Sequence, residues 1–201
     1  MKFILLMRIY IYLFAFALFL NSCSIGSMHE ELLNELKNSV NDSLIDHFPT
    51  QFKLSKYSSF VYDRPNTLYP NGLRTYLMTK IDKNEIIYYK ELSNTKISFS
   101  DNKVIEIDYY DHLNNPDISF LPSQEVYPLP TFNSIKEILV RNNIEIDSFD
   151  FYILELKSGL FYDKNYLPEV LEMPSNWKHG ISKGYAINED KMLLICWLYI
   201  W

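Results

Sequence analysis

The sequence predicts an α+β fold: an antiparallel sheet, made of a meander and a C-terminal hairpin, with an N-terminal amphipathic helix and one short second helix. Three observations support this fold class. Residues 29–48 carry apolar side chains at helical spacing, residues 52–110 form short β-prone runs, and residues 191–201 are almost entirely apolar. Helical and strand patterns that occupy separate parts of a chain are typical of α+β domains.

The first predicted element is a helix over His29–Phe48. Its apolar side chains recur every four residues, and acidic and polar side chains occupy the opposite side. This spacing is typical of an amphipathic helix. Pro49 disfavours helical geometry at Phe48, so we expect the helix to end there. The apolar stripe consists of Leu32, Leu36, Val40, Leu44 and Phe48.

Five β-prone runs follow the helix and are separated by turn residues such as Asn71-Gly72 and Ser93-Asn94. Connections this short join antiparallel neighbours, because a parallel pair needs a crossover of roughly a dozen residues or more. We therefore expect an antiparallel meander. Its predicted strands are Phe52–Tyr62, Leu73–Ile81, Glu85–Leu92, Thr95–Phe99 and Lys103–Tyr110.

The remaining elements follow a proline-rich segment, Asn114–Thr131, that we expect to be irregular. Ser134-Ile135-Lys136-Glu137 has the form of a capping box and predicts a short helix to about Asn142. Further strands are expected at Phe149–Lys157 and, as a hairpin around Asn188-Glu189-Asp190, at Gly184–Asn188 and Lys191–Trp201. The last of these is apolar on both faces, which indicates a central strand.

The N-terminal region combines Lys2 and Arg8 with an apolar run at Ile9–Leu20 and the sequence Leu20-Asn21-Ser22-Cys23. It resembles the signal peptide of bacterial lipoproteins, and the resemblance covers only the first 23 residues. It implies that Cys23 becomes the mature N-terminus and carries acyl chains. The alternative is an uncleaved anchor, but the apolar run has 12 residues, whereas a membrane span needs about 20.

This resemblance divides the chain into a signal peptide at 1–22, a lipidated tether at 23–28 and a single α+β domain at 29–201. The five residues after Cys23 reach at most ~18 Å, so the domain is expected to stay close to its membrane. Ser24 is compatible with sorting to the outer membrane. We therefore expect a lipid anchor in the cell membrane, and in a Gram-negative source the outer membrane, with the domain facing the periplasm.

Charge and cysteine content narrow the classes of partner. Removing residues 1–22, which contain Lys2 and Arg8 but no acidic residue, changes the formal net charge from −6 to −8. An acidic surface argues against nucleic acid and against electrostatic docking on anionic lipid, which leaves the acyl chains as the link to the bilayer. Cys23 and Cys196 are the only cysteines, so we expect no disulfide. Cys196 has apolar neighbours and is interpreted as a buried side chain rather than a reactive thiol.

Two local patterns resemble catalytic or metal sites. Residues 180–184 fit the pattern GxSxG, but a nucleophile elbow needs a helix after Ser182, and a strand is expected there. Asp108, Asp111 and His112 are clustered, yet their spacing matches no defined metal site. We therefore predict no catalytic residue, no metal and no cofactor.

Aromatic loop residues are the candidate binding residues. The loop from Tyr62 to Tyr69 includes Arg64, and a second loop contains Trp177. Such side chains stack on sugar rings or fill a pocket in a partner. The alternative is that the many aromatic residues reflect AT-rich codons and have no ligand.

Two functional hypotheses remain. The preferred one is a non-enzymatic, membrane-anchored binding lipoprotein of the cell envelope that masks or inhibits a protein partner, as immunity-type lipoproteins do. The alternative is an envelope hydrolase with an active site assembled from distant loops, using carboxylates or His112 or His179. The short tether, the acidic charge and the lack of a catalytic motif favour the first.

Overall fold

The computed structural model describes residues 30–65, 67–68, 72–93, 95–101, 103–107, 126–167 and 177–201. The chain divides into two units, Met1–Val40 and Asn41–Trp201, and each is described by itself. In the first unit residues 30–39 are helical. The Val40 amide donates a hydrogen bond to the Leu36 carbonyl at 3.0 Å.

Of the helix predicted over His29–Phe48, residues 30–39 are helical, and the prediction of one continuous helix to Phe48 is wrong. A separate short helix, α2 (Asp42–Ile45), follows a break at Asn41. The backbone of Asn41 is non-helical (φ −59°, ψ 131°), and its side chain accepts a hydrogen bond from the Ser43 amide at 3.0 Å. Asparagine favours such N-cap positions because its side chain competes with the helix for backbone donors.

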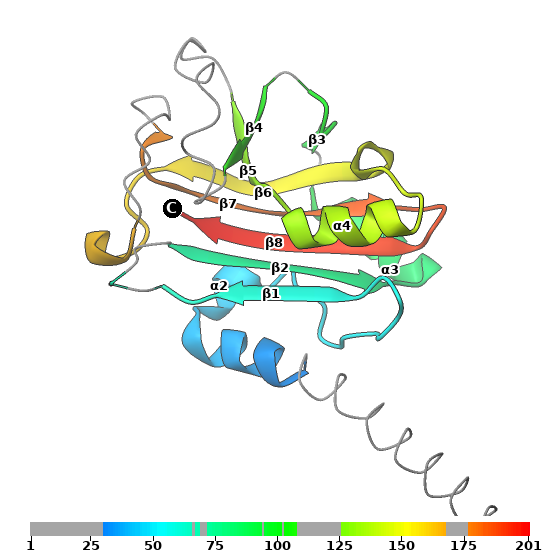
Figure 1. Ribbon diagram of the computed structural model, residues 1–201, viewed down its shortest axis with the longest axis horizontal. Helices are drawn as coiled ribbons and strands as arrows, with labels where there is room; N and C mark the ends of the chain where they lie inside the picture. The colour runs from blue at the N-terminus through cyan, green and yellow to red at the C-terminus, as the bar shows by residue number, and fades with distance from the viewer. Residues whose placement is uncertain are drawn as a thin grey trace, which may run out of the picture. The chain divides into compact units, whose positions relative to one another are not determined.

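An antiparallel sheet of six strands forms the centre of the second unit (Figure 1). Its strand order is β1-β2-β8-β7-β6-β3. The sheet and its C-terminal β7–β8 hairpin confirm the predicted α+β class. The strands are β1 (Ser59–Asp63), β2 (Leu73–Lys80), β3 (Lys96–Ile97), β6 (Asp150–Ser158), β7 (Gly180–Asn188) and β8 (Leu193–Ile200).

The central position predicted for the last strand is confirmed. β8 pairs along its whole length with β2 on one side and β7 on the other. All eight of its residues are buried. Alternate side chains point to opposite faces of a strand, so both faces of this sheet need a covering layer.

One face is covered by α4 (Asn133–Arg141) together with β4 (Val104–Ile107) and β5 (Tyr127–Pro130) (Figure 1). Phe132, which precedes α4, is fully buried and has a left-handed backbone (φ 51°). This conformation is unfavourable for a bulky residue. Ring contacts stabilise it, with the rings of Tyr76, Phe99, Phe151 and Trp197 at centroid distances of 5.6–6.3 Å.

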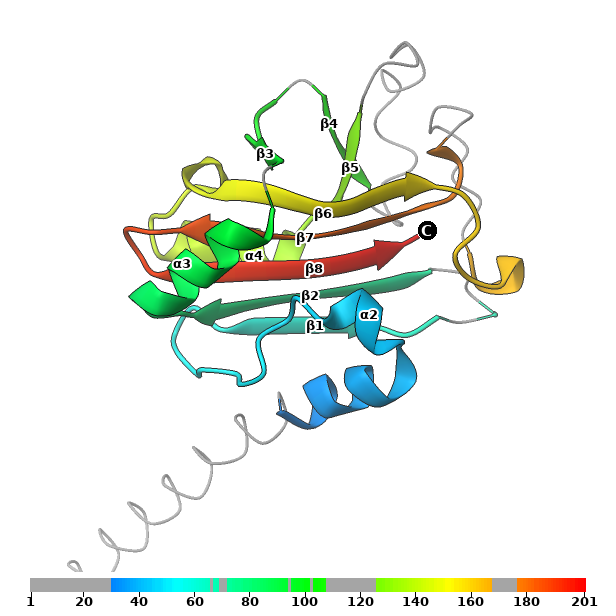
Figure 2. The same ribbon diagram turned by 180° about the vertical axis from the view of Figure 1, so that it is seen from behind.

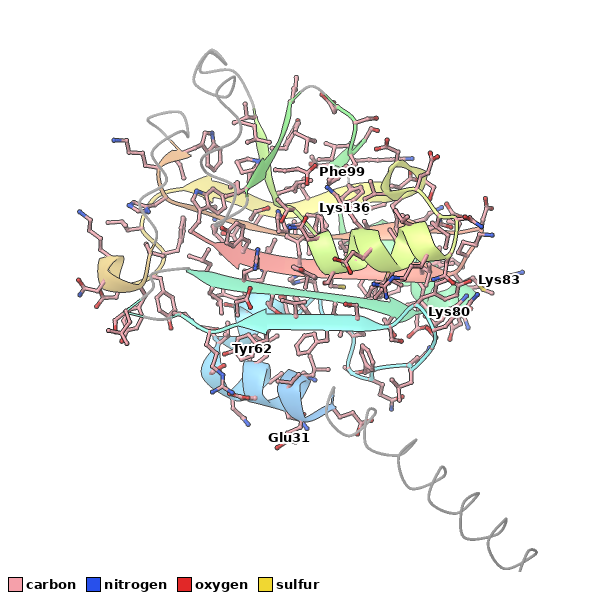
Figure 3. The ribbon with its side chains drawn as sticks, in the orientation of Figure 1. Glu31, Tyr62, Lys80, Lys83, Phe99 and Lys136 are labelled. Carbon is pink, nitrogen blue, oxygen red and sulfur yellow. The ribbon has the colours of Figure 1, made fainter. Side chains whose placement is uncertain are left out.

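The capping box predicted at the start of α4 is wrong. No side chain caps this helix, and its N-cap residue is Phe132. The Ser134 hydroxyl instead bonds to the Tyr76 hydroxyl at 3.1 Å. Lys136 points from α4 toward Phe99, with its ammonium 4.8 Å from the ring centroid, and pairs with Glu106 of β4 (Figure 3).

The opposite face carries α2 and α3 (Lys83–Leu92) (Figure 2). The strand predicted at Glu85–Leu92 is therefore wrong. Asp82 accepts hydrogen bonds from the amides of Asn84 and Glu85, and the Glu85 side chain accepts from the Asp82 amide. This reciprocal capping box starts a helix, and helical spacing buries Ile86 and Tyr89 together.

The predicted meander holds only for β1 and β2, which pair with each other. β3 pairs with β6 instead. β4 forms a parallel pair with β5, and β5 lies within the segment predicted to be irregular. The strand predicted at Phe149–Lys157 is confirmed as β6.

Substitution of Trp201, the residue that follows β8, tests how strongly the stability of the fold depends on the C-terminal end of the chain. The amide and carbonyl of Trp201 bond to Gly180, and its side chain is fully buried. We expect Trp201→Ala to lower the free energy of unfolding by about 3–5 kcal/mol, because it removes a large buried ring and leaves a cavity. Denaturant unfolding measures this change. The control, Phe161→Ala, truncates an exposed aromatic side chain, and an equal loss in both variants would contradict the assignment.

Candidate functional site

A groove of about 630 Å³ opens on the face of the sheet that carries α2 and α3, which is the face seen in Figure 2. We call it the α2/α3 groove. Its floor comes from β6 and β7, and its walls come from α3 and from the residues that follow α2. The lining residues are Asp46, His47, Tyr88, Leu92, Leu154, Glu155, Leu156, Lys157 and Lys183.

A β-bulge in β6 gives the groove its charged floor. The pairing register between β6 and β7 shifts at Ile153/Glu155, so that Glu155 lies opposite Lys183. Without the extra residue, strict alternation would direct Leu154 and Leu156 to this face and Glu155 to the other. Leu156 instead packs against the core beneath α4. The bulge therefore exchanges an apolar side chain for a carboxylate.

Lys183 connects the floor to α2. Its ammonium donates a hydrogen bond to the Ser43 carbonyl at 2.7 Å. It also lies 3.7 Å from an Asp46 carboxylate oxygen and 3.8 Å from one of Glu155. The Lys183 side chain is only 12% exposed, whereas those of Glu155 and Asp46 are 22% and 66% exposed, so water screens the Asp46 pair more than the Glu155 pair.

His47 is sealed behind this charged layer. Its Nε2 lies 2.9 Å from the Trp197 carbonyl, and a carbonyl only accepts, so Nε2 carries the proton. Nδ1 is 3.7 Å from Asp46 Oδ1 and has no hydrogen-bond partner. Burial lowers the pKa of His47 to about 4, against the smaller opposing effects of the Trp197 carbonyl and Asp46. The imidazole is therefore neutral at pH 7.

This geometry favours recognition over acid–base chemistry. A general base must reach the proton that it removes, and its pKa should lie near the working pH. The His47 side chain is 1% exposed, its pKa is low and its Nε2 is engaged by the backbone. Lys183 is held by a carbonyl and by two carboxylates. Within the described residues the groove therefore offers fixed charges and apolar walls.

The GxSxG pattern has a packing role. Ser182 lies within β7, is fully buried and accepts a hydrogen bond from Trp197 Nε1 at 3.0 Å. A Cβ on Gly184 would lie 2.7 Å from the Trp197 ring, and one on Gly180 would lie 2.7 Å from the Trp201 ring. These small residues leave room for the indoles of Trp197, in β8, and of Trp201, directly after it. Ser182 is on a strand without a following helix, as expected from the sequence.

The structure separates the aromatic candidates. Tyr62 is on β1 (Figure 3), and the Arg64 guanidinium lies 5.9 Å from its ring centroid. In the pairing register Tyr62 shares the α2/α3 face, whereas Trp177 stacks on Trp201 and packs against the cluster on the opposite face. Trp177 also accepts a hydrogen bond from Trp201 through its carbonyl. Tyr69 lies outside the described residues.

Of the cysteine and metal candidates, the structure describes Cys196 only. Cys196 is fully buried, and burial raises the pKa of its thiol, as expected of an unreactive side chain. Cys23 and the cluster of Asp108, Asp111 and His112 lie outside the described residues. Among the residues that the structure describes, no three His, Cys, Asp or Glu side chains are grouped to hold a metal ion.

Comparison with protein-family models, with curated proteins and with solved structures gives no match. In the described part of the chain, no helix has both the length and the apolar character needed to cross a membrane.

The groove was missed at the sequence level because its residues come from four separate segments. The sequence pattern predicts Asp46 and His47 at the end of one helix and Tyr88 and Leu92 in a strand. One available signal was Asp82-x-x-Glu85, a capping-box pattern directly before the apolar pair Ile86-Ile87. The bulge in β6 has no comparable signal, because Leu154-Glu155-Leu156 alternates regularly.

His47 predicts a pH dependence of stability. A histidine with a folded-state pKa of about 4 and an unfolded value of 6.5 stabilises the fold fully above pH 6.5. This contribution, about 3 kcal/mol, is lost as the pH falls from 6.5 to 4, because the unfolded chain takes up the proton first.

The measurement compares unfolding free energies at pH 7 and pH 4 for the wild-type protein and His47→Gln. The glutamine amide can donate to the Trp197 carbonyl but does not titrate. We expect the pH-dependent loss to be smaller in His47→Gln, and equal losses in both proteins would contradict this account of His47.

Proposed function

We propose that this protein is a lipid-anchored, non-enzymatic binding protein of the cell envelope, and that its α2/α3 groove receives a segment of a partner protein. The observation that carries the proposal is the groove itself. It combines an exposed apolar wall with charges held around the largely buried Lys183. This combination suits recognition, since apolar anchors provide affinity and placed charges provide specificity.

The wall and the floor have distinct roles in this proposal. Tyr88 is 55% exposed and Leu92 is 38% exposed, so both are available to a partner. The Lys183 ammonium lies within 4 Å of a carboxylate oxygen of Asp46 and of one of Glu155, so these charges need little reordering on binding. A partner segment with apolar side chains and one charged side chain matches this surface. Masking or inhibition of that partner is the corresponding biological role.

The membrane anchor rests on the sequence at Leu20–Cys23. A single acyl chain holds a protein only marginally, and two or more chains make a stable anchor. An anchored binding protein with a short tether meets partners at the surface of the same membrane. The partner is therefore sought among envelope proteins.

Partner capture tests the groove. Full-length protein is used to recover partners from detergent-extracted envelopes, with the double variant Tyr88→Asp, Leu92→Asp in parallel. We expect the variant to recover at least about ten-fold less partner, because both apolar anchors become charged. Val140→Asp is the matched control, since Val140 is 72% exposed on α4. Equal recovery by all three proteins, or no enriched partner, would refute the proposed role.

Lipidation is tested separately with the two cysteines. We expect cells fed an alkyne-tagged fatty acid to label the wild-type protein and Cys196→Ala but not Cys23→Ala. The unlabelled variant should also leave the membrane fraction on washing with carbonate, because its acyl chains are missing. Label on Cys23→Ala, or its retention in washed membranes, would exclude this anchor.

A further inference from the structure

Exposed apolar side chains gather at one end of the sheet. Directly after β6, three consecutive residues are exposed: Leu160 by 61%, Phe161 by 40% and Tyr162 by 38%. Single exposed apolar residues are common on protein surfaces, but a run of three large ones is not required by the fold. Gly159, with φ +134°, turns the chain away from β6 just before this run.

A second loop lies beside this run. The Gly72 amide donates a hydrogen bond to the Tyr166 carbonyl at 2.8 Å, which joins the β1–β2 loop to η3 (Lys164–Tyr166). In the same β1–β2 loop Leu68 is 83% exposed. In Figure 1 both loops lie at the left end of the sheet, where the C-terminus is marked. We call the described residues 64–65, 67–68, 157–167 and 177–179 the loop end.

Charge at the loop end differs from that of the whole chain. Its described residues include four cations and one carboxylate, whereas the protein has a formal net charge of −6. Asp163 also caps η3, accepting a hydrogen bond from the Asn165 amide at 2.9 Å. Glu169 and Glu172 belong to a segment outside the described residues. The cations are Arg64, Lys157, Lys164 and Lys178, and all four are exposed. Lys157 pairs with the Glu155 carboxylate at 2.7 Å.

We propose that the loop end docks on a lipid bilayer, with Leu160, Phe161 and Tyr162 entering the boundary between head groups and acyl chains. Leucine and aromatic side chains at loop tips, flanked by lysine and arginine, are typical of peptides and segments that bind in this boundary. The flanking cations contact lipid phosphates, and each adds attraction to an anionic surface. The side chains lie on loop tips, outside the α2/α3 groove, and this shape fits a fluid surface better than a folded partner.

This surface shares only Lys157 with the lining of the proposed partner groove. The groove lies on a face of the sheet between α2 and α3, and the loop end lies where β1, β6 and β8 terminate. The net acidic charge of the mature chain argues against electrostatic docking on lipid only when that charge is spread evenly. Here the described cations are concentrated where the apolar side chains are exposed.

The test places a photoactivatable residue at the loop end of the full-length protein. Phe161→benzoylphenylalanine is irradiated in envelope membranes, and the adducts are identified by mass. We expect phospholipid adducts at position 161 and none with the matched control, Val140→benzoylphenylalanine on α4. Adducts with protein only, equal lipid adducts at both positions, or no adduct at position 161 would each overturn the proposal.

A second measurement separates apolar insertion from attraction by charge. The same protein is reconstituted in phosphatidylethanolamine vesicles with or without phosphatidylglycerol. We expect Leu160→Ser to lower the adduct yield roughly ten-fold in both vesicles, because it removes an inserted apolar side chain. The double variant Lys164→Gln, Lys178→Gln should lower the yield only when phosphatidylglycerol is present. Unchanged yields in both variants would overturn the proposed geometry.

Discussion

The burial of β8 on both faces is the constraint on which the rest of the second unit depends. A strand whose eight residues are all buried cannot lie at an edge or against solvent. β2 and β7 satisfy its backbone, while α4 with β4 and β5 covers one face and α2 with α3 covers the other. The two indoles at Trp197 and Trp201 explain why β7 has glycine at positions 184 and 180. Large indole side chains on and after β8 thus require residues without a Cβ on the neighbouring strand β7.

The same constraint accounts for the groove. α2 has four residues and α3 has ten, and neither extends over the whole of the second face. In this part of β6, a regular strand would direct both Leu154 and Leu156 to the second face. The bulge turns Leu156 toward the core and places Glu155 on this face, opposite Lys183, while Leu154 still lines the groove. A charged floor is the physical consequence of a face that the helices cover only in part, and it supplies the fixed charges on which the proposed partner binding depends.

The sequence was informative wherever one periodicity was strong and local. The buried C-terminal strand, its hairpin, β2, β6 and α4 were predicted close to their observed positions. Glu85–Leu92 failed because Ile, Tyr and Leu favour strands, whereas the decisive signal was the Asp82–Glu85 capping box together with inward Ile86 and Tyr89. The prediction for the start of α4 was wrong for the opposite reason. There a capping pattern was present, but tertiary packing of Phe132 determined the backbone.

The groove could not be predicted because register and bulges are long-range properties. A shift of one residue between β6 and β7 decides which side chains share a face, and nothing within residues 150–158 records it. Exposure has the same origin. Leu160, Phe161 and Tyr162 have the composition of a buried strand, and only the end of β6 at Ser158 places them outside the core. Apolar side chains that the sheet does not cover contact either water or an apolar environment outside the protein. A bilayer offers both an apolar interior for these side chains and lipid phosphates for the cations that flank them.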